Sequence, residues 1–263
     1  MALTKVIGAG LGNVDGPVGV GTASADASAL LTLNKSPTAA FGNPVLQVGG
    51  STYTSGGYYS IGLGYTNATY TEPPAEIAYV PTSDSGGTTG YLTFGTRSVT
   101  TNTAVTESMR IDGNGHVTMP KQPAFYAHKN GTDQNNFSNS GSYVTVTWSH
   151  EQYDVNGDFA SNTFTAPVTG KYLLCLNIRL HNVDTAASYY IGGFLTSNQR
   201  YNSLFDPDGL SADATYWTIA ISALAEMDAN DTATVVVYQE GGTAQTDIGG
   251  SNEYTWFSGC LLC

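Results

Sequence analysis

Three aspartates in a short polar stretch are the residues best suited to hold a ligand. Asp206 and Asp208 lie in the sequence Asp-Pro-Asp-Gly, and Asp213 follows shortly after. Calcium binds several oxygen ligands, and carboxylates supply them. The same sequence is typical of a turn, because proline and glycine favour the backbone angles of one. The stretch therefore predicts a turn, with a calcium site formed by Asp206, Asp208 and Asp213 as the alternative.

A second acidic stretch, residues 154–158, begins like the calcium loop of an EF-hand but does not complete it. Phe159 stands where that loop needs glycine, and Thr165 stands where it needs glutamate. The four histidines are scattered, and no nucleophile-elbow, phosphate-loop or zinc-protease motif occurs. These patterns predict a protein that is not an enzyme and that needs no cofactor apart from the calcium just considered.

Aromatic residues cluster in the second half of the chain. Such rings offer flat faces to sugars, but they also pack well inside sandwiches and between subunits. The clusters are Tyr189-Tyr190, Tyr201, Tyr216-Trp217 and Tyr254 with Trp256. Core and interface packing is the leading interpretation. We expect Tyr189 and Tyr201, which stand beside polar stretches, to be the exposed members.

Composition excludes several classes of protein. The chain has 263 residues, a net charge of −12 and only 11% charged residues. A strongly acidic chain does not suit nucleic acid, whose binding depends on basic side chains. The low charge and ordinary apolar content argue against a disordered chain. No apolar run reaches the length of a membrane span, and the first residues do not resemble a signal peptide, so we expect no membrane insertion.

The chain divides at the proline pair Pro120 and Pro123, because proline disfavours helix and interrupts strand pairing. Upstream, short β-prone pieces such as residues 58–65 alternate with glycine, and residues 112–115 predict a tight turn. Strands this short bury little alone and would have to pair with further copies. Downstream, every second residue of 172–180 is a large apolar residue, and residues 232–239 contain a continuous apolar run. No helical pattern lies between these segments. This second half predicts an antiparallel sandwich or jelly roll.

Four segments of the second half resemble C1q-like domains, in that family's order. Residues 164–172 (FTAPVTGKY) are similar to its FTAPxxGxY segment, and residues 255–262 (TWFSGCLL) to its TxFSGFLL terminus. Residues 122–127 (QPAFYA) and 224–235 (LAEMDANDTATV) resemble its opening and a late strand pair, although Asn230 replaces a glycine. The resemblance implies a C1q/TNF-like antiparallel jelly roll that assembles as a homotrimer. It also implies that a loop near 206–213 can hold calcium.

The first half resembles glycine-rich segments of bacteriophage fibre proteins. These are residues 18–24 (VGVGTAS), 90–97 (GYLTFGTR) and 106–117 (TESMRIDGNGHV), where His116 replaces the usual Asn or Lys. The two resemblances together imply an all-β homotrimer. Residues 1–20 would anchor it to the virion, residues 21–120 would form an intertwined β-rich shaft, and residues 121–263 a jelly-roll knob.

The implied function is that of a non-enzymatic virion fibre on the tail or capsid, assembled in the host cytoplasm. Its partners would be further copies of itself, other virion proteins at the N-terminus, and a host-surface glycan or protein. Host contact is expected in the knob loops 182–188, 202–213 and 241–253. The expected contact residues are Tyr189, Tyr201, Asp206, Asp208, Gln245, Asp247 and Asn252. A decoration protein without a receptor and a polysaccharide-degrading tailspike remain alternatives.

The three cysteines, Cys175, Cys260 and Cys263, form neither a disulfide framework nor a zinc-site pattern. The C1q-like resemblance places the strands of Cys175 and Cys260 side by side, so that a bridge between them is geometrically allowed. Assembly inside a reducing cell favours free thiols. We therefore expect the cysteines to be unbridged.

Overall fold

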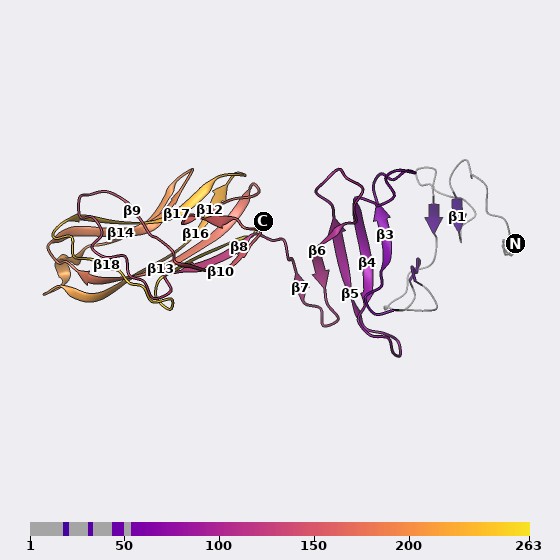
Figure 1. Cartoon of the computed structure of the whole chain (residues 1–263), viewed down its shortest axis with the longest axis horizontal. Coiled ribbons are helices and arrows are strands. Elements are labelled where there is room, and N and C mark those ends of the chain that lie inside the picture. The colour runs from indigo at the N-terminus through magenta and orange to yellow at the C-terminus, as the bar shows by residue number, and fades with distance from the viewer. Residues whose placement is uncertain (1–17, 21–30, 34–43, 50–53) are drawn as a thin grey trace. The chain divides into compact units, whose positions relative to one another are not determined.

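The computed structural model describes residues 18–20, 31–33, 44–49 and 54–263. The chain divides into two compact units, Met1–Val117 and Thr118–Cys263, and the division falls beside the predicted proline pair (Figure 1). The described elements are all strands apart from one short 3-10 turn, and none of them is a helix that could cross a membrane. The all-β prediction is therefore confirmed. The anchor, shaft and knob roles stay predictions, and the anchor lies almost wholly outside the described residues.

The N-terminal unit contains a five-stranded antiparallel sheet, called here the N-terminal sheet. Its strands follow chain order: β3 (Tyr59–Leu63), β4 (Ala75–Pro81), β5 (Gly90–Thr96), β6 (Thr106–Ile111) and β7 (Val117–Thr118). A separate parallel pair joins β1 (Val18–Val20) to β2 (Leu31–Leu33). The predicted turn after β6 is confirmed, because the Gly115 amide donates to the Asp112 carbonyl at 3.0 Å and Gly115 has a φ of +87°.

The C-terminal unit is a sandwich of two antiparallel sheets. Sheet I has the order β10 (His150–Val155), β8 (Ala124–His128), β19 (Trp256–Leu261), β13 (Gly170–Val183) and β16 (Ala214–Met227), with β18 (Asp247–Ile248) beside β13. Sheet II has the order β11 (Phe159–Ala160), β12 (Thr163–Thr165), β17 (Thr232–Gly241), β14 (Ala187–Thr196) and β15 (Arg200–Phe205), with β9 (Val144–Thr145) beside β17. Strands adjacent in sequence repeatedly switch between the sheets, as in a jelly roll.

The sandwich core follows from the alternation of apolar residues along the strands. On β13, Tyr172, Leu174, Leu176, Ile178 and Leu180 are all at most 2% exposed, as the sequence predicts. Side chains in a strand alternate between its two faces, so this one face fills the space between the sheets.

Phe125 lies at the centre of the core. Its ring centroid is 4.7 Å from those of Phe164 and Phe257 and 4.9 Å from that of Phe159. Gly259 allows this packing, because a Cβ there would meet the Phe125 ring at 2.6 Å.

The two ends of the sandwich differ, and this difference positions the candidate site. The chain enters and leaves at one end, called here the base, where the Leu261 amide donates to the Pro123 carbonyl and the Lys171 amide to the Cys263 carbonyl. The opposite end, called here the tip, consists of the connections 129–143, 184–186, 206–213, 242–246 and 249–255. Figure 1 shows these loops at the end of the sandwich remote from the C-terminus.

Candidate functional site

The tip loops are joined to one another by side-chain hydrogen bonds. The Asp213 carboxylate accepts from the Thr185 amide at 2.9 Å, from the Thr185 hydroxyl at 2.8 Å and from Gln245 Nε2 at 2.8 Å. Three separate connections thereby meet at one carboxylate. These bonds, the Thr185 amide first, hold the pKa of Asp213 below its ordinary value. Gln245 also donates to the Asn182 carbonyl at 3.3 Å.

A second carboxylate ties the same loops together from beneath. Asp184 is 4% exposed and accepts from the Ala186 amide at 2.8 Å and from the Thr243 amide. The buried Tyr190 hydroxyl accepts from the Asp184 amide at 3.0 Å and lies 2.9 Å from the Thr246 hydroxyl. Burial raises the pKa of Tyr190, so this hydroxyl keeps its proton. The tip is consequently a braced surface rather than a set of independent loops.

Asp247 braces the side of the tip formed by residues 129–143. It lies on β18 and accepts from the Asn136 amide at 2.7 Å and from Asn182 Nδ2 at 3.1 Å. Asn136 and Asn182 both have positive φ, of 48° and 53°, a conformation that asparagine tolerates better than most residues. Asn252 is exposed in the adjoining turn.

Asp206 and Asp208 occupy the predicted turn. Asp206 accepts from the Asp208 amide at 3.0 Å and caps the 3-10 turn Pro207–Gly209, and both side chains are exposed. The turn prediction is confirmed. Asp213 is held by Thr185 and Gln245 instead, and the described part of the chain holds no group of three His, Cys, Asp or Glu side chains arranged for a metal ion.

The structure separates two predicted tyrosines from this site. Tyr201 was expected beside the loop 202–213, but it lies near the start of β15, at the base, in a cavity of about 330 Å³ that is also lined by Asn198, Gln199, Glu226 and Asp228. The strand β15 runs from the base to the tip, where Asp206 follows it. Tyr201 and Asp206 are therefore close in sequence but lie at opposite ends of the sandwich. Tyr189 lies on the outer face of sheet II, stacked on Tyr238 with centroids 5.6 Å apart. Tyr189 and Tyr201 are both half-buried, whereas Tyr216 is 60% exposed and Tyr254 is 44% exposed. The expectation that Tyr189 and Tyr201 are the exposed members of the aromatic clusters is therefore wrong.

Next to the tip, β13 contributes a cation, Arg179, that the sequence analysis did not single out. The Arg179 guanidinium lies 4.3 Å from the Tyr254 ring centroid and 5.1 Å from that of Tyr216. Its Nε donates to His181 Nε2 at 3.0 Å, which fixes its orientation. The register of β13 against β16, which places His181 opposite Tyr216, brings these residues together.

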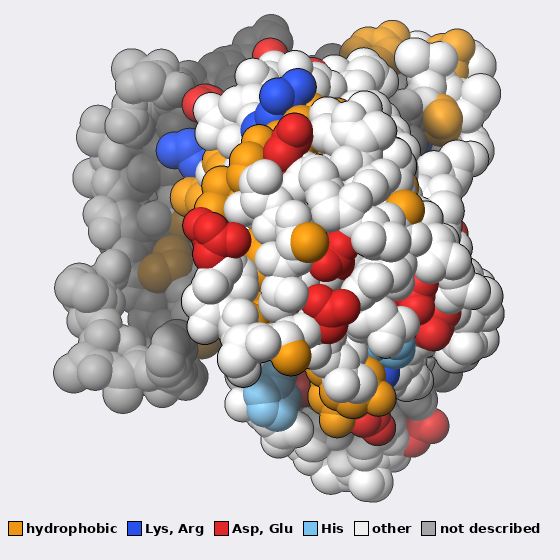
Figure 2. Space-filling view, turned by 90° about the vertical axis from the view of Figure 1, so that its left-hand side faces the viewer, with side chains coloured by type: hydrophobic (Ala, Val, Ile, Leu, Met, Phe, Trp, Pro, Cys, Tyr) orange, Lys and Arg blue, Asp and Glu red, His pale blue; other side chains and the backbone are white. Residues whose placement is uncertain are grey.

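The electrostatic character of the tip is acidic. The connections that form the tip contain one lysine, the buried Lys129, and six carboxylates: Asp133, Asp184, Asp206, Asp208, Asp213 and Glu253. Figure 2 looks onto this end of the C-terminal unit and shows Asp and Glu side chains spread across it. Such a surface suits neutral, hydroxyl-rich or cationic ligands better than polyanions.

Comparison of the chain with known proteins shows similarity of fold only. No protein-family model and no curated protein matches the chain. Among solved structures, the globular domain of zebrafish complement 1qA protein is similar at 15% identity, over 54% of this chain and 98% of that chain, with a TM-score of 0.38. Murine APRIL is similar at 12% identity, over 54% of this chain and 100% of that chain, with a TM-score of 0.39. The strand order of its own two sheets gives the C-terminal unit an antiparallel jelly-roll fold.

Proposed function

We propose that the chain is a non-enzymatic bacteriophage virion fibre, a homotrimer that is attached by its N-terminal region and contacts the host surface with the tip of its jelly-roll knob. The observation that carries the proposal is the separation of tip from base. The chain enters the knob at the base, so the braced and exposed loops of the tip lie at the opposite end. Rigid scaffolds that present polar loops at a free end are the usual way to build a recognition surface.

The outer face of sheet I supports the homotrimeric part of the proposal. Its centre is small and uncharged: Cys175 lies opposite Ser222 on one side and Ser258 on the other. Aromatic rings flank this centre, with Trp256 stacked on Tyr126 at 5.8 Å and Tyr126 on Tyr153 at 6.1 Å.

The same face leaves apolar side chains uncovered. Leu224 is 54% exposed and Tyr153 is 50% exposed. A shallow cavity of about 300 Å³ lies among Cys175, Ala220 and Trp256. A flat apolar face with an aromatic rim and a shallow hollow suits burial against a neighbouring subunit.

Host contact is tested with the full chain and the phage that carries it. We expect the purified chain to compete with phage particles for adsorption to host cells. The double substitution of Asp208 and Asn252 to Lys should abolish this competition without changing the mass in solution, because both side chains are exposed at the tip. Asp228→Lys, at the base, is the matched control and should compete like the wild type. A trimer that does not compete would favour a decoration protein instead, and immunogold labelling of virions would then locate it.

A further inference from the structure

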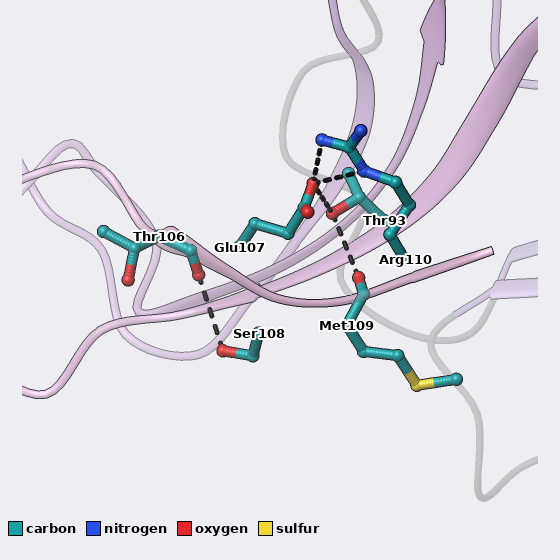
Figure 3. Close-up of polar contacts among 6 residues, drawn as sticks. All are labelled: Thr93, Thr106, Glu107, Ser108, Met109 and Arg110. Atoms are coloured by element: carbon teal, nitrogen blue, oxygen red, sulfur yellow. Dashed lines mark hydrogen bonds and ion pairs between the residues drawn. The ribbon is translucent and has the colours of Figure 1, made fainter. Parts of the chain in front are cut away.

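Both units of the chain pack an arginine on a tyrosine ring, but the two arginines differ in their charge partners. The Arg110 guanidinium lies 3.7 Å from the centroid of the Tyr91 ring. Figure 3 shows that the Glu107 carboxylate accepts from Arg110 Nε at 3.0 Å and from Nη2 at 2.8 Å, so this charge is balanced within the chain. Arg179 has no such carboxylate. Among the described residues, ion pairs join Arg110 to Glu107, His116 to Asp112 and His181 to Asp133.

Three neighbouring side chains hold the Arg179 guanidinium in one orientation. The centroids of the Tyr254 and Tyr216 rings lie 4.3 Å and 5.1 Å from it, and its Nε donates to His181 Nε2 at 3.0 Å. Its two terminal nitrogen atoms, Nη1 and Nη2, have no acceptor in the part of the chain that the structure describes. The N–H groups of a guanidinium match the two oxygen atoms of a carboxylate, and an arginine held in place loses little freedom on binding one.

The backbone around Arg179 is held in place as well. The Arg179 amide donates to the Thr255 hydroxyl at 3.3 Å, and the Arg179 carbonyl accepts from the Gly249 amide at 2.7 Å. Asn177 Nδ2 donates to the Tyr254 carbonyl at 2.7 Å. These bonds fix the last connection of the tip against β13. The arginine and the tyrosine are therefore in position before any ligand binds.

The two tyrosines beside Arg179 are open to solvent. Tyr216 is 60% exposed and Tyr254 is 44% exposed. Neither hydroxyl has a hydrogen-bond partner among the described residues. An aromatic ring offers an apolar face to the carbon atoms of a sugar, and the tyrosine hydroxyl can donate to or accept from the hydroxyl groups of the sugar. This group of residues thus combines a cation for a carboxylate with surfaces for a sugar ring.

The carboxylates near Arg179 are occupied by other donors. Asp133 accepts from the Gly250 amide, and Asp247 accepts from the Asn136 amide at 2.7 Å. These charges remain at the tip and repel a ligand that carries many negative charges. The surroundings therefore suit a ligand with one carboxylate among hydroxyl groups, and they disfavour a polyanion.

We infer that Arg179, Tyr216 and Tyr254 form a binding site for a sugar that carries a carboxylate, such as a uronic acid. The inference rests on the proposed function, since it names the chemical class of the host-surface ligand. The guanidinium binds the carboxylate by two hydrogen bonds, and the tyrosines contact the sugar ring. Arg179 lies four residues beyond Cys175 along β13, about 13 Å nearer the tip, so the site lies at the margin of the face proposed for subunit contact.

Saturation-transfer NMR on the full chain tests the site with glucuronate and with glucose, its neutral counterpart. We expect glucuronate to bind at least about tenfold more tightly than glucose, because only the carboxylate forms charge-assisted hydrogen bonds with the guanidinium. Arg179→Gln should lose this preference. Arg200→Gln is the matched control and should keep it, because Arg200 also lies over a tyrosine ring, 4.9 Å from the centroid of Tyr143, but on sheet II. Equal binding of the two sugars by the wild type, or a preference that survives in Arg179→Gln, would overturn the inference.

Two further measurements identify a different occupant. Acetate that binds as tightly as glucuronate would show that the sugar ring is not recognised, and the inference would give way to an acidic peptide as ligand. A lower solution mass for Arg179→Gln than for the wild type would show that a carboxylate of a neighbouring copy occupies Arg179, and the inference would be wrong while the homotrimer stood.

The failure of the inference is distinguishable from the failure of the proposed function. A wild-type trimer that competes with phage for adsorption but does not bind glucuronate would refute the inference alone. A wild-type chain that is monomeric, or that does not compete with phage, would refute the proposed function itself.

Discussion

Replacing Leu224 by alanine measures the contribution of the outer face of sheet I to assembly. Leu224 is 54% exposed in the single chain and lies opposite Leu173 on β13. Fully burying a leucine side chain contributes about 1.5–3 kcal/mol, so covering the exposed half contributes about 1 kcal/mol per chain. Three chains together lose about 3 kcal/mol, which raises the overall dissociation constant about a hundredfold at tenfold per 1.4 kcal/mol.

The assay is sedimentation or light scattering over a dilution series, with Leu204→Ala as the matched control. Leu204 is 62% exposed and lies on β15 in sheet II, so it offers a similar side chain on the other sheet. We expect Leu224→Ala to dissociate at about a tenfold higher concentration than Leu204→Ala, because the midpoint concentration of a trimer scales with the square root of its overall dissociation constant. Equal dissociation of the two variants would refute the reasoning. Weaker assembly of Leu204→Ala alone would place the interface on sheet II.

Three further predictions concern titrating groups. Lys129 is 1% exposed, and burial lowers the pKa of its ammonium group. The unfolded chain therefore binds more protons, and stability should rise as pH rises through the lowered pKa. Lys129→Met should remove this rise when the free energy of unfolding is measured with denaturant over that pH range. Hydrogen bonds lower the pKa of Asp213, so its hydrogen bonds to Thr185 and Gln245 should be fully formed above the ordinary carboxyl pKa and be lost as pH falls through the lowered pKa. Hydrogen exchange of residues 184–186 should follow that titration in the wild type and be fast at all pH values in Asp213→Ala. Cys263 is exposed, whereas Cys175 is half-buried and burial raises the pKa of its thiol. Labelling with a maleimide, followed by mass spectrometry, should therefore modify Cys263 first and Cys175 last. Equal labelling rates in the folded chain would contradict the placement of Cys175.

Local patterns in the sequence predicted the strands well. The alternation along residues 172–180 sufficed to identify the core face of β13, and Asp-Pro-Asp-Gly sufficed to predict the turn after β15. Both signals act over a few residues, because side-chain direction in a strand and backbone angles in a turn are set locally.

Contacts between distant segments could not be read in the same way. Asp213 meets Thr185 and Gln245 only because β13 and β17 end at the tip and β14 and β16 begin there. Tyr201 was misplaced for the same reason, since the direction of β15 depends on its pairing with β14. The apolar row Ile61–Ile77–Phe94–Met109 of the N-terminal sheet likewise forms only once four short strands are paired in register.

The solution mass of the full chain tests the central claim most directly. Multi-angle light scattering at micromolar concentration should give three times the mass of one chain, and the mass should fall on dilution sooner for Leu224→Ala than for the wild type. A wild-type chain that scatters as a stable monomer, with the outer face of sheet I open to water, would contradict the account.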